Sequence, residues 1–133
     1  FLHDAVERAI YQPVQSAEIQ RKSLSLMRHP DNLWVGLTYR ARVIMYHPDR
    51  VAVDELQSYE GLTDAKWSKR LCLRVSANSY NQGLVAGFLA FFGEEWTQRT
   101  LRSWLGNLAI EPLKGDTLVL EAIAEGRCDL GVT

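Results

Sequence analysis

The chain has 133 residues, 47% of them hydrophobic, and a formal net charge of −1, which is typical of one globular domain with a buried core. This charge balance gives no indication of a nucleic-acid-binding surface. No apolar stretch approaches the ~20 residues needed to cross a bilayer, and the first residues lack the basic and then apolar pattern of a signal peptide.

Both ends of the sequence indicate a piece of a longer protein. It starts at Phe1 without a methionine, and it ends in Asp129–Thr133, which has the apolar pattern of a buried strand. We therefore expect any signal peptide to lie outside these residues.

The first third of the chain predicts a helical lead-in over residues 1–32, followed by extended segments. Apolar residues at helical spacing predict a first helix that Pro13 ends, and a second short helix begins near Ser16. After a turn at His29–Asn32, the β-forming segments Leu33–Thr38 and Ala41–Tyr46 predict extended chain up to a second turn at His47–Arg50.

The strongest structural signal begins at Leu71–Val75, a nearly continuous apolar run typical of a strand covered on both faces. The polar turn Ser76–Asn81 follows, and then a helix with apolar residues at helical spacing up to Phe92. Gly93 is predicted to end that helix. Gly83 and Gly87, on one face of it, are predicted to let it approach the sheet closely.

The remaining elements alternate between helices and strands. We predict a helix over Thr97–Leu108, a short strand at Ala109–Leu113, a helix that Gly115-Asp116-Thr117 caps, and a last strand at Asp129–Thr133. Such alternation over residues 71–133 predicts an α/β fold with a βαβαβ core, in which the first and last strands are parallel neighbours. The loop after the first strand then lies at the carboxyl edge, where open α/β sheets bind ligands.

The chain has two cysteines, Cys72 and Cys128. If the first and last strands are neighbours, both residues fall at the same edge of the sheet and can form a disulfide. Two buried thiols are the alternative, and the residues leave both interpretations open.

The three histidines do not predict a catalytic or metal site, because His29 and His47 each precede a proline in a polar turn and His3 lies near the terminus. The Gly-x-Ser-x-Gly, Walker A and dinucleotide-binding motifs are absent from the sequence, which therefore does not predict an enzyme. His47-Pro48-Asp49 resembles the signature of the J domain, a co-chaperone module. That alternative requires a helix instead of an extended segment at Arg42–Tyr46.

A broader resemblance covers most of the chain. Several sequence blocks occur in the same order in the ferric-ion-binding periplasmic proteins of ABC importers: Gly36-Leu37-Thr38-Tyr39-Arg40-Ala41-Arg42-Val43-Ile44, Tyr59-Glu60-x-Leu62-x-Asp64-x-Lys66-Trp67, Leu71-Cys72-Leu73-Arg74, Ser76-x-Asn78-x-Tyr80-Asn81-Gln82 and Gly115-Asp116-Thr117. The resemblance implies two α/β lobes of the type II periplasmic-binding fold joined by crossing strands, here residues 33–48. This chain would hold mainly one lobe.

The resemblance also implies a function and a set of site residues. In that family tyrosinate oxygens hold Fe(III) in the cleft between the lobes, and hard anionic oxygen suits a hard trivalent cation. Tyr80 matches a metal ligand, and Arg40 matches an arginine near the metal or a synergistic anion. Ser76, Asn78 and Gln82 belong to the same loop and are candidates for the surroundings of the metal or anion.

Further expectations follow from the same resemblance. The remaining metal ligands lie outside this chain, so the isolated chain should bind ferric ion poorly. The whole protein would be extracytoplasmic and would deliver iron to a membrane permease. The chain departs from the family at Ile110–Gly115, near the cleft, so a receptor for an anionic or phosphorylated small molecule, using Arg40 and the helix start at Tyr80–Gln82, is the alternative.

Overall fold

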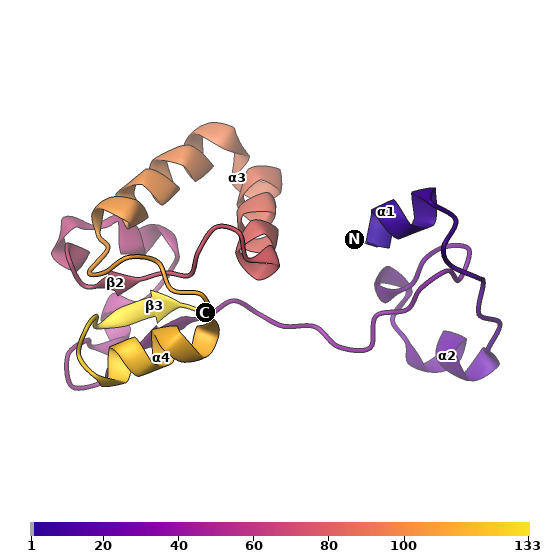
Figure 1. The fold of residues 1–133 in the computed structure, drawn as a ribbon, viewed down its shortest axis with the longest axis horizontal. Coiled ribbons are helices and arrows are strands. Elements are labelled where there is room, and N and C mark those ends of the chain that lie inside the picture. The colour runs from indigo at the N-terminus through magenta and orange to yellow at the C-terminus, as the bar shows by residue number, and fades with distance from the viewer. Residues whose placement is uncertain (1) are drawn as a thin grey trace. The chain divides into compact units, whose positions relative to one another are not determined.

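The computed structural model describes residues 2–133 (Figure 1). Its contacts divide the chain into two compact units, one ending at Ala41 and one running from Arg42 to Thr133. Within the described residues, no helix is both long enough and apolar enough to span a membrane.

The amino-terminal unit contains two short helices, α1 (Leu2–Glu7) and α2 (Ala17–Lys22), and the single-turn helix η1 (Ser25–Met27). Both predicted helices are confirmed, although α1 ends well before Pro13. Ser16 caps α2 by accepting a hydrogen bond from the Ile19 N–H at 3.3 Å.

The strand predicted at residues 33–38 is wrong. Among the described residues, sheet pairing in this segment is limited to one antiparallel bridge between Val35 and Arg28. The β-forming residues of this segment lie beside no strand long enough to form a ladder with them. β propensity alone does not produce a strand without such a partner.

A three-stranded sheet forms the centre of the carboxy-terminal unit, with the strand order β1 (Ile44–Tyr46), β3 (Leu130–Val132), β2 (Leu71–Cys72). β2 and β3 are parallel, and Leu71 lies opposite Leu130, which confirms the predicted pairing. β1 is antiparallel to β3, so the sheet is mixed. Because β1 is extended, the J-domain alternative loses the helix that it requires.

The strand predicted at Ala109–Leu113 is reduced to two isolated parallel bridges beside β2, Leu71 with Leu108 and Arg74 with Leu113. The Leu113 N–H donates to the Leu73 carbonyl at 2.9 Å. Pro112 lies between the two bridges and has no N–H to donate, which interrupts the ladder.

Two helices and three single-turn helices complete this unit: α3 (Ser79–Gly106), α4 (Asp116–Ala124), η2 (Val53–Glu55), η3 (Glu60–Thr63) and η4 (Ala65–Trp67). Figure 1 shows α3 as two arms on one side of the sheet and α4 on the other. The arms meet at Gly93, whose φ of 80° is left-handed. Gly93 therefore ends the first arm as predicted, but the second arm follows it directly.

Two hydrophobic clusters lie between the sheet and the helices on its two sides. The larger cluster lies among α3, the single-turn helices and the sheet, and contains Val51, Leu62, Trp67, Leu71, Phe88, Trp104, Leu130 and Val132. The smaller one lies under α4 and contains Cys72, Val119, Ala122, Ile123 and Cys128. The sheet is thus covered on both faces, as the apolar strands predicted.

The glycine that allows close packing on the sheet is Gly131, in the central strand. A Cβ atom at Gly131 would lie 2.7 Å from Val119 Cγ1 and 2.8 Å from the Cys72 carbonyl oxygen. At Gly83 and Gly87 a Cβ atom would meet no other described atom within 4 Å. The prediction for those two glycines is therefore wrong, because the α3 face that carries them does not pack against the sheet.

Candidate functional site

The first turn of α3 follows β2 at the carboxyl edge of the sheet. Asn78 caps this helix, because its Oδ1 accepts a hydrogen bond from the Tyr80 N–H at 2.9 Å. Tyr80 is thereby held in the first turn, with 47% of its surface exposed.

Amide side chains fix the loop before this helix. Asn81 Nδ2 donates to the carbonyl oxygens of Arg74 and Val75 at 3.0 and 3.3 Å. Gln82 Nε2 donates to the Ser76 carbonyl at 3.3 Å. These bonds tie the helix start to the end of the strand, so the position of Tyr80 is set by the sheet.

Two arginines lie against the Tyr80 ring. The Cζ atoms of Arg42 and Arg74 are 5.3 and 5.7 Å from the ring centroid, within the range of cation–π contacts. Arg74 continues the β2 segment, and its side chain is only 5% exposed. Arg42 precedes Val43, which exchanges backbone hydrogen bonds with Thr133 at the carboxyl end of β3.

Asp116, the first residue of α4, joins the two guanidinium groups. Its Oδ1 accepts from Arg42 Nη1 at 3.1 Å and also from Arg74 Nη1. Its Oδ2 lies 3.5 Å from Arg42 Nη2. We call Arg42, Arg74, Asp116 and Tyr80 the Tyr80 cluster.

The pKa of Asp116 lies below its ordinary value. Burial of the carboxyl raises this pKa, but the hydrogen bond and the charge of Arg42, and then those of Arg74, together lower it by more. Asp116 is therefore ionised at neutral pH, and the two guanidiniums and one carboxylate leave one net positive charge beside Tyr80.

This charge lies at the positive end of the α3 dipole, and both effects favour an anionic oxygen at this edge. Arg74 also keeps unused capacity, because its Nε is buried without a hydrogen-bond partner among the described residues. The arrangement is suited to holding an anion.

Tyr59 contacts the backbone of the Tyr80 cluster at Arg42. Its hydroxyl donates to the Arg42 carbonyl, and Trp104 Nε1 donates to the Tyr59 carbonyl at 3.1 Å. Burial of the Tyr59 ring raises the pKa of its phenol, and the nearby Arg42 charge opposes that rise. Tyr59 therefore serves as a neutral hydrogen-bond donor that fixes the backbone at Arg42.

A cavity of about 710 Å³ adjoins the site. Arg74, Ser76 and Gln82 line one part of it, and apolar side chains of both α3 arms line another. Glu111 and Pro112 also line it. The segment in which the sequence departs from the ferric-binding pattern thus borders this cavity.

The predicted site residues divide between the two units. Ser76, Asn78, Tyr80 and Gln82 come together in one loop and helix start, whereas Arg40 is an exposed residue of the amino-terminal unit. The structure assigns Asn78 and Gln82 hydrogen bonds that shape the loop.

Sequence reasoning did not assign Arg42, Arg74 or Asp116 to the binding site. A signal for Arg74 existed, since an arginine within a buried apolar strand requires a partner charge. Asp116 was interpreted as part of a helix cap, but the cap residue is Gly115 and the Asp116 carboxylate bonds the arginines instead.

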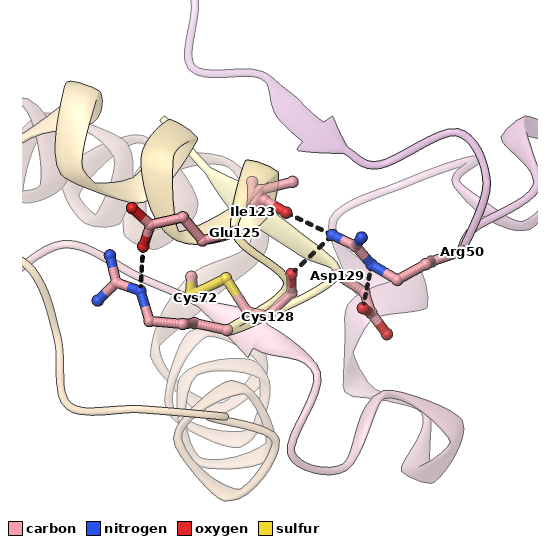
Figure 2. Close-up of a disulfide and its surroundings, with 7 residues drawn as sticks. Arg50, Cys72, Ile123, Glu125, Cys128 and Asp129 are labelled. Atoms are coloured by element: carbon pink, nitrogen blue, oxygen red, sulfur yellow. Dashed lines mark hydrogen bonds and ion pairs between the residues drawn. A yellow bond between two sulfur atoms is a disulfide. The ribbon is translucent and has the colours of Figure 1, made fainter.

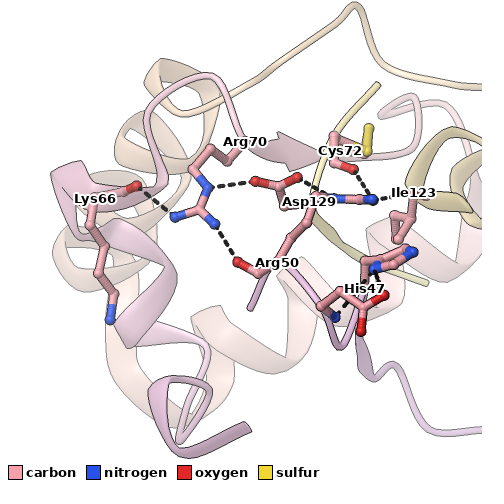
Figure 3. A network of polar contacts seen from close by, with 9 residues as sticks. His47, Arg50, Lys66, Arg70, Cys72, Ile123 and Asp129 are labelled. Atoms are coloured by element: carbon pink, nitrogen blue, oxygen red, sulfur yellow. Dashed lines mark hydrogen bonds and ion pairs between the residues drawn. A yellow bond between two sulfur atoms is a disulfide. The ribbon is translucent and has the colours of Figure 1, made fainter. Parts of the chain in front are cut away.

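The opposite, amino edge of the parallel strands carries a second ion-pair group, which we call the Asp129 cluster. Asp129 accepts from Arg50 Nε at 2.7 Å and from Arg70 Nε at 2.6 Å (Figure 3). The His47 N–H donates to the Asp129 carbonyl at 2.9 Å, so the His-Pro-Asp turn is part of this structural group.

Cys72 and Cys128 form a disulfide in the structure, with their Cα atoms 5.9 Å apart (Figure 2). The bond joins β2 to the residue before Asp129, beneath α4. Arg50 Nη2 donates to the carbonyls of Cys128, at 3.4 Å, and Ile123. The disulfide and the Asp129 cluster thus hold the same end of the sheet.

His29 and His47 lie at the predicted turns, whereas His3 lies in α1. The Nδ1 atoms of His29 and His47 accept hydrogen bonds from the N–H groups of Asp31 and Asp49 at 3.1 and 3.3 Å. Within residues 2–133, no group of three or more His, Cys, Asp or Glu side chains is arranged to hold a metal ion.

The fold and the position of the site define a class of protein: the chain has the α/β architecture of part of a type II periplasmic-binding protein, as predicted. No protein-family model matches it. It is 44% identical to iron uptake protein A1 of Synechocystis over 126 residues, which cover 95% of this chain and 35% of that protein.

Two solved structures make the likeness more specific. Trichodesmium IdiA (FutA), solved with iron and citrate ligands, is 35% identical with a TM-score of 0.87 over 98% of this chain and 41% of that chain. The apo ferric ion-binding protein A of Pasteurella haemolytica is 32% identical, with a TM-score of 0.88 over 98% and 42%. The predicted resemblance to ferric-ion-binding proteins is confirmed, and the chain spans 35–42% of the length of these three proteins.

Proposed function

We propose that this chain is part of the solute-binding component of an ABC importer, that the whole protein binds ferric iron in the cleft between two lobes, and that Tyr80 is one of the metal ligands. The observation that carries this proposal is the placement of Tyr80 at the positive end of a helix, with two guanidiniums against its ring. Similarity to an iron uptake protein and to ferric-binding structures supports it.

The chemistry of the cluster suits this cargo. Fe(III) is a hard cation that binds anionic oxygen strongly, and a phenolate is such a ligand. Arg42 and Arg74 lie against the ring that would carry this oxygen. The same guanidiniums offer charge-assisted hydrogen bonds to an anion that accompanies the metal, as citrate accompanies iron in the Trichodesmium structure.

The proposal extends to the rest of the protein. Residues 33–48 cross between the two lobes, Arg40 faces the bound metal or its anion, and the other ligands belong to residues outside these 133. The protein works outside the cytoplasm, passes its ion to a membrane permease and catalyses no reaction. The 133-residue chain alone, which offers one tyrosine ligand, should bind ferric ion weakly.

A receptor for an anionic or phosphorylated small molecule is the second candidate. The Nε of Arg74 is buried and lacks a hydrogen-bond partner among residues 2–133, which favours this function because an anion that reached it would satisfy this donor. The two candidates differ in their requirement for the Tyr80 hydroxyl, because an anion receptor can use the guanidiniums without it.

Replacement of Tyr80 by phenylalanine in the complete protein tests the proposal. Tyr80→Phe keeps the ring against the arginines but removes the oxygen. The affinity for ferric ion, measured in competition with citrate, should drop by more than the ~10- to 100-fold typical of losing an outer partner of a metal ligand. The tyrosinate-to-iron absorption band should weaken.

Tyr11→Phe is the matched control, because it removes a phenol oxygen that does not belong to the Tyr80 cluster and should leave both quantities unchanged. If Tyr80→Phe binds ferric ion with unchanged affinity and an unchanged band, the iron proposal is wrong. Tight binding of phosphate or citrate without iron by that variant would then support the anion receptor.

A further inference from the structure

The carboxylate of Asp116 bonds both guanidiniums that lie against the Tyr80 ring. The three charged residues come from separate segments, namely the residues before β1, the residues after β2 and the first turn of α4. One oxygen, Oδ1, accepts from Nη1 of both arginines. A shared acceptor atom fixes the separation of the two guanidiniums from each other.

Burial makes this bridge necessary. The Arg74 side chain is 5% exposed and that of Arg42 is 13% exposed, so neither charge is fully hydrated. Two like charges this close to one ring repel each other unless an anion lies between them. Removing one partner of such a buried group leaves the remaining charges uncompensated.

The backbone reinforces the position of Asp116. The Val75 N–H donates to the Leu113 carbonyl at 2.9 Å, three residues before Asp116, so the residues before α4 are tied to the segment that follows β2. Asp116 lies in the first turn of α4, where the helix dipole also favours its negative charge. The carboxylate therefore has a defined place relative to the sheet and to the guanidiniums.

We infer that Asp116 is a positioning residue for the metal site: it holds Arg42 and Arg74 against the Tyr80 ring and thereby sets the orientation and the charge surroundings of the phenol. This inference rests on the proposed role of Tyr80 as a ferric ligand. Asp116 itself acts through the arginines and does not bind the metal.

The Asp129 cluster supplies a matched control for the test. Asp129 also lies between two arginines, and its carboxylate is 19% exposed compared with 35% for Asp116. It lies at the amino edge of the parallel strands. Asp116→Asn and Asp129→Asn each remove one charge that compensates two arginines, but only Asp116→Asn alters the surroundings of Tyr80.

The experiment compares these two variants in the complete protein, loaded with ferric ion. Asp116→Asn should shift the tyrosinate-to-iron band and lower the ferric affinity, measured against citrate, by about 10- to 100-fold. Asp129→Asn should lower the thermal unfolding temperature but leave the band and the affinity unchanged. Asp116→Glu, which keeps the charge but displaces the carboxylate by one methylene, should shift the band and preserve the folded state even if Asp116→Asn does not fold.

An unchanged band and affinity in a folded Asp116→Asn variant, or in Asp116→Glu if Asp116→Asn does not fold, would overturn the positioning role. If Tyr80→Phe still weakens the band in that case, the ferric proposal stands without the positioning role of Asp116. If Tyr80→Phe also leaves the band intact, both proposals are wrong.

Discussion

The two edges of the parallel strands carry the same ionic arrangement, one carboxylate between two arginines, yet they differ in what the arginines do with their other donors. At the amino edge, Arg50 and Arg70 also donate to backbone carbonyls, including that of Arg50 itself, which accepts from Arg70 Nη2 at 2.8 Å (Figure 3). At the carboxyl edge, the guanidiniums of Arg42 and Arg74 lie against an exposed tyrosine ring, and Arg74 Nε has no hydrogen-bond partner among the described residues.

The different partners of the guanidiniums show how the same arrangement of one carboxylate and two arginines can stabilise the fold at one edge and provide a binding site at the other. Guanidiniums that donate to the chain's own carbonyls as well as to a carboxylate fix loops in place. Guanidiniums with unused donors, next to an ionisable phenol and a helix start, keep their capacity for a ligand. Changes at the amino edge should therefore alter stability alone, whereas changes at the carboxyl edge should alter binding.

The largest expected effect on stability belongs to the disulfide at the amino edge. Cys72 and Cys128 are 56 residues apart, and closing a loop of that length stabilises a fold by about 4 kcal/mol in the chain-entropy model. Reduction should lower the free energy of unfolding of the metal-free protein in urea by about that amount, whereas a Cys72→Ala/Cys128→Ala variant should not respond to the reductant.

Thiol titration of unfolded, unreduced protein checks the bond itself. No free thiol is expected at Cys72 or Cys128. Two free thiols, or equal stability before and after reduction, would contradict the stabilising role assigned to the amino edge.

A smaller effect is expected from Asn78→Ala at the carboxyl edge. The variant loses the cap that accepts the Tyr80 N–H, which should cost about 1 kcal/mol of unfolding free energy. Because the same bond holds the backbone of Tyr80, ferric affinity should also fall. Urea unfolding and competition with citrate measure the two quantities. A loss of stability without any change in affinity would make Asn78 purely structural.

The smallest effect is the contribution of Asp116 to acid stability. Its pKa is lower in the folded protein than the ordinary value of about 3.9. Its contribution is therefore fully present above that ordinary value and is lost as the pH falls further, through the lower pKa of the folded protein. The carboxylate is 35% exposed, and solvent screening limits this contribution to less than about 1 kcal/mol.

Unfolding in urea at pH 5 and at pH 3 measures that contribution. The metal-free Asp116→Asn variant should lose less stability between these two pH values than the parent protein does. An equal loss in both proteins would show that protonation of Asp116 does not weaken the Tyr80 cluster.

Local sequence patterns were sufficient to predict the elements that position the site. The apolar run at Leu71, the Asn78 region as a helix start, and the pairing of β2 with β3 all follow from hydrophobic period and capping chemistry. The strand expected at residues 109–113 failed because Pro112 interrupts its ladder, and strand length depends on such interruptions as well as on propensity.

Local sequence patterns could not predict which residues make up the Tyr80 cluster. Asp116 is 74 residues from Arg42 and 42 residues from Arg74, and periodicity carries no information on which distant charges meet. The resemblance supplied Tyr80, because its motif is local. The bridging carboxylate required the three-dimensional arrangement of β1, β2 and α4.

The most direct test of the central claim is a crystal structure of the complete protein with ferric ion bound. We predict that the Tyr80 phenolate oxygen coordinates the iron, and that Arg42 and Arg74 remain against its ring with Asp116 between them. A bound iron whose ligands do not include the Tyr80 oxygen would contradict the account.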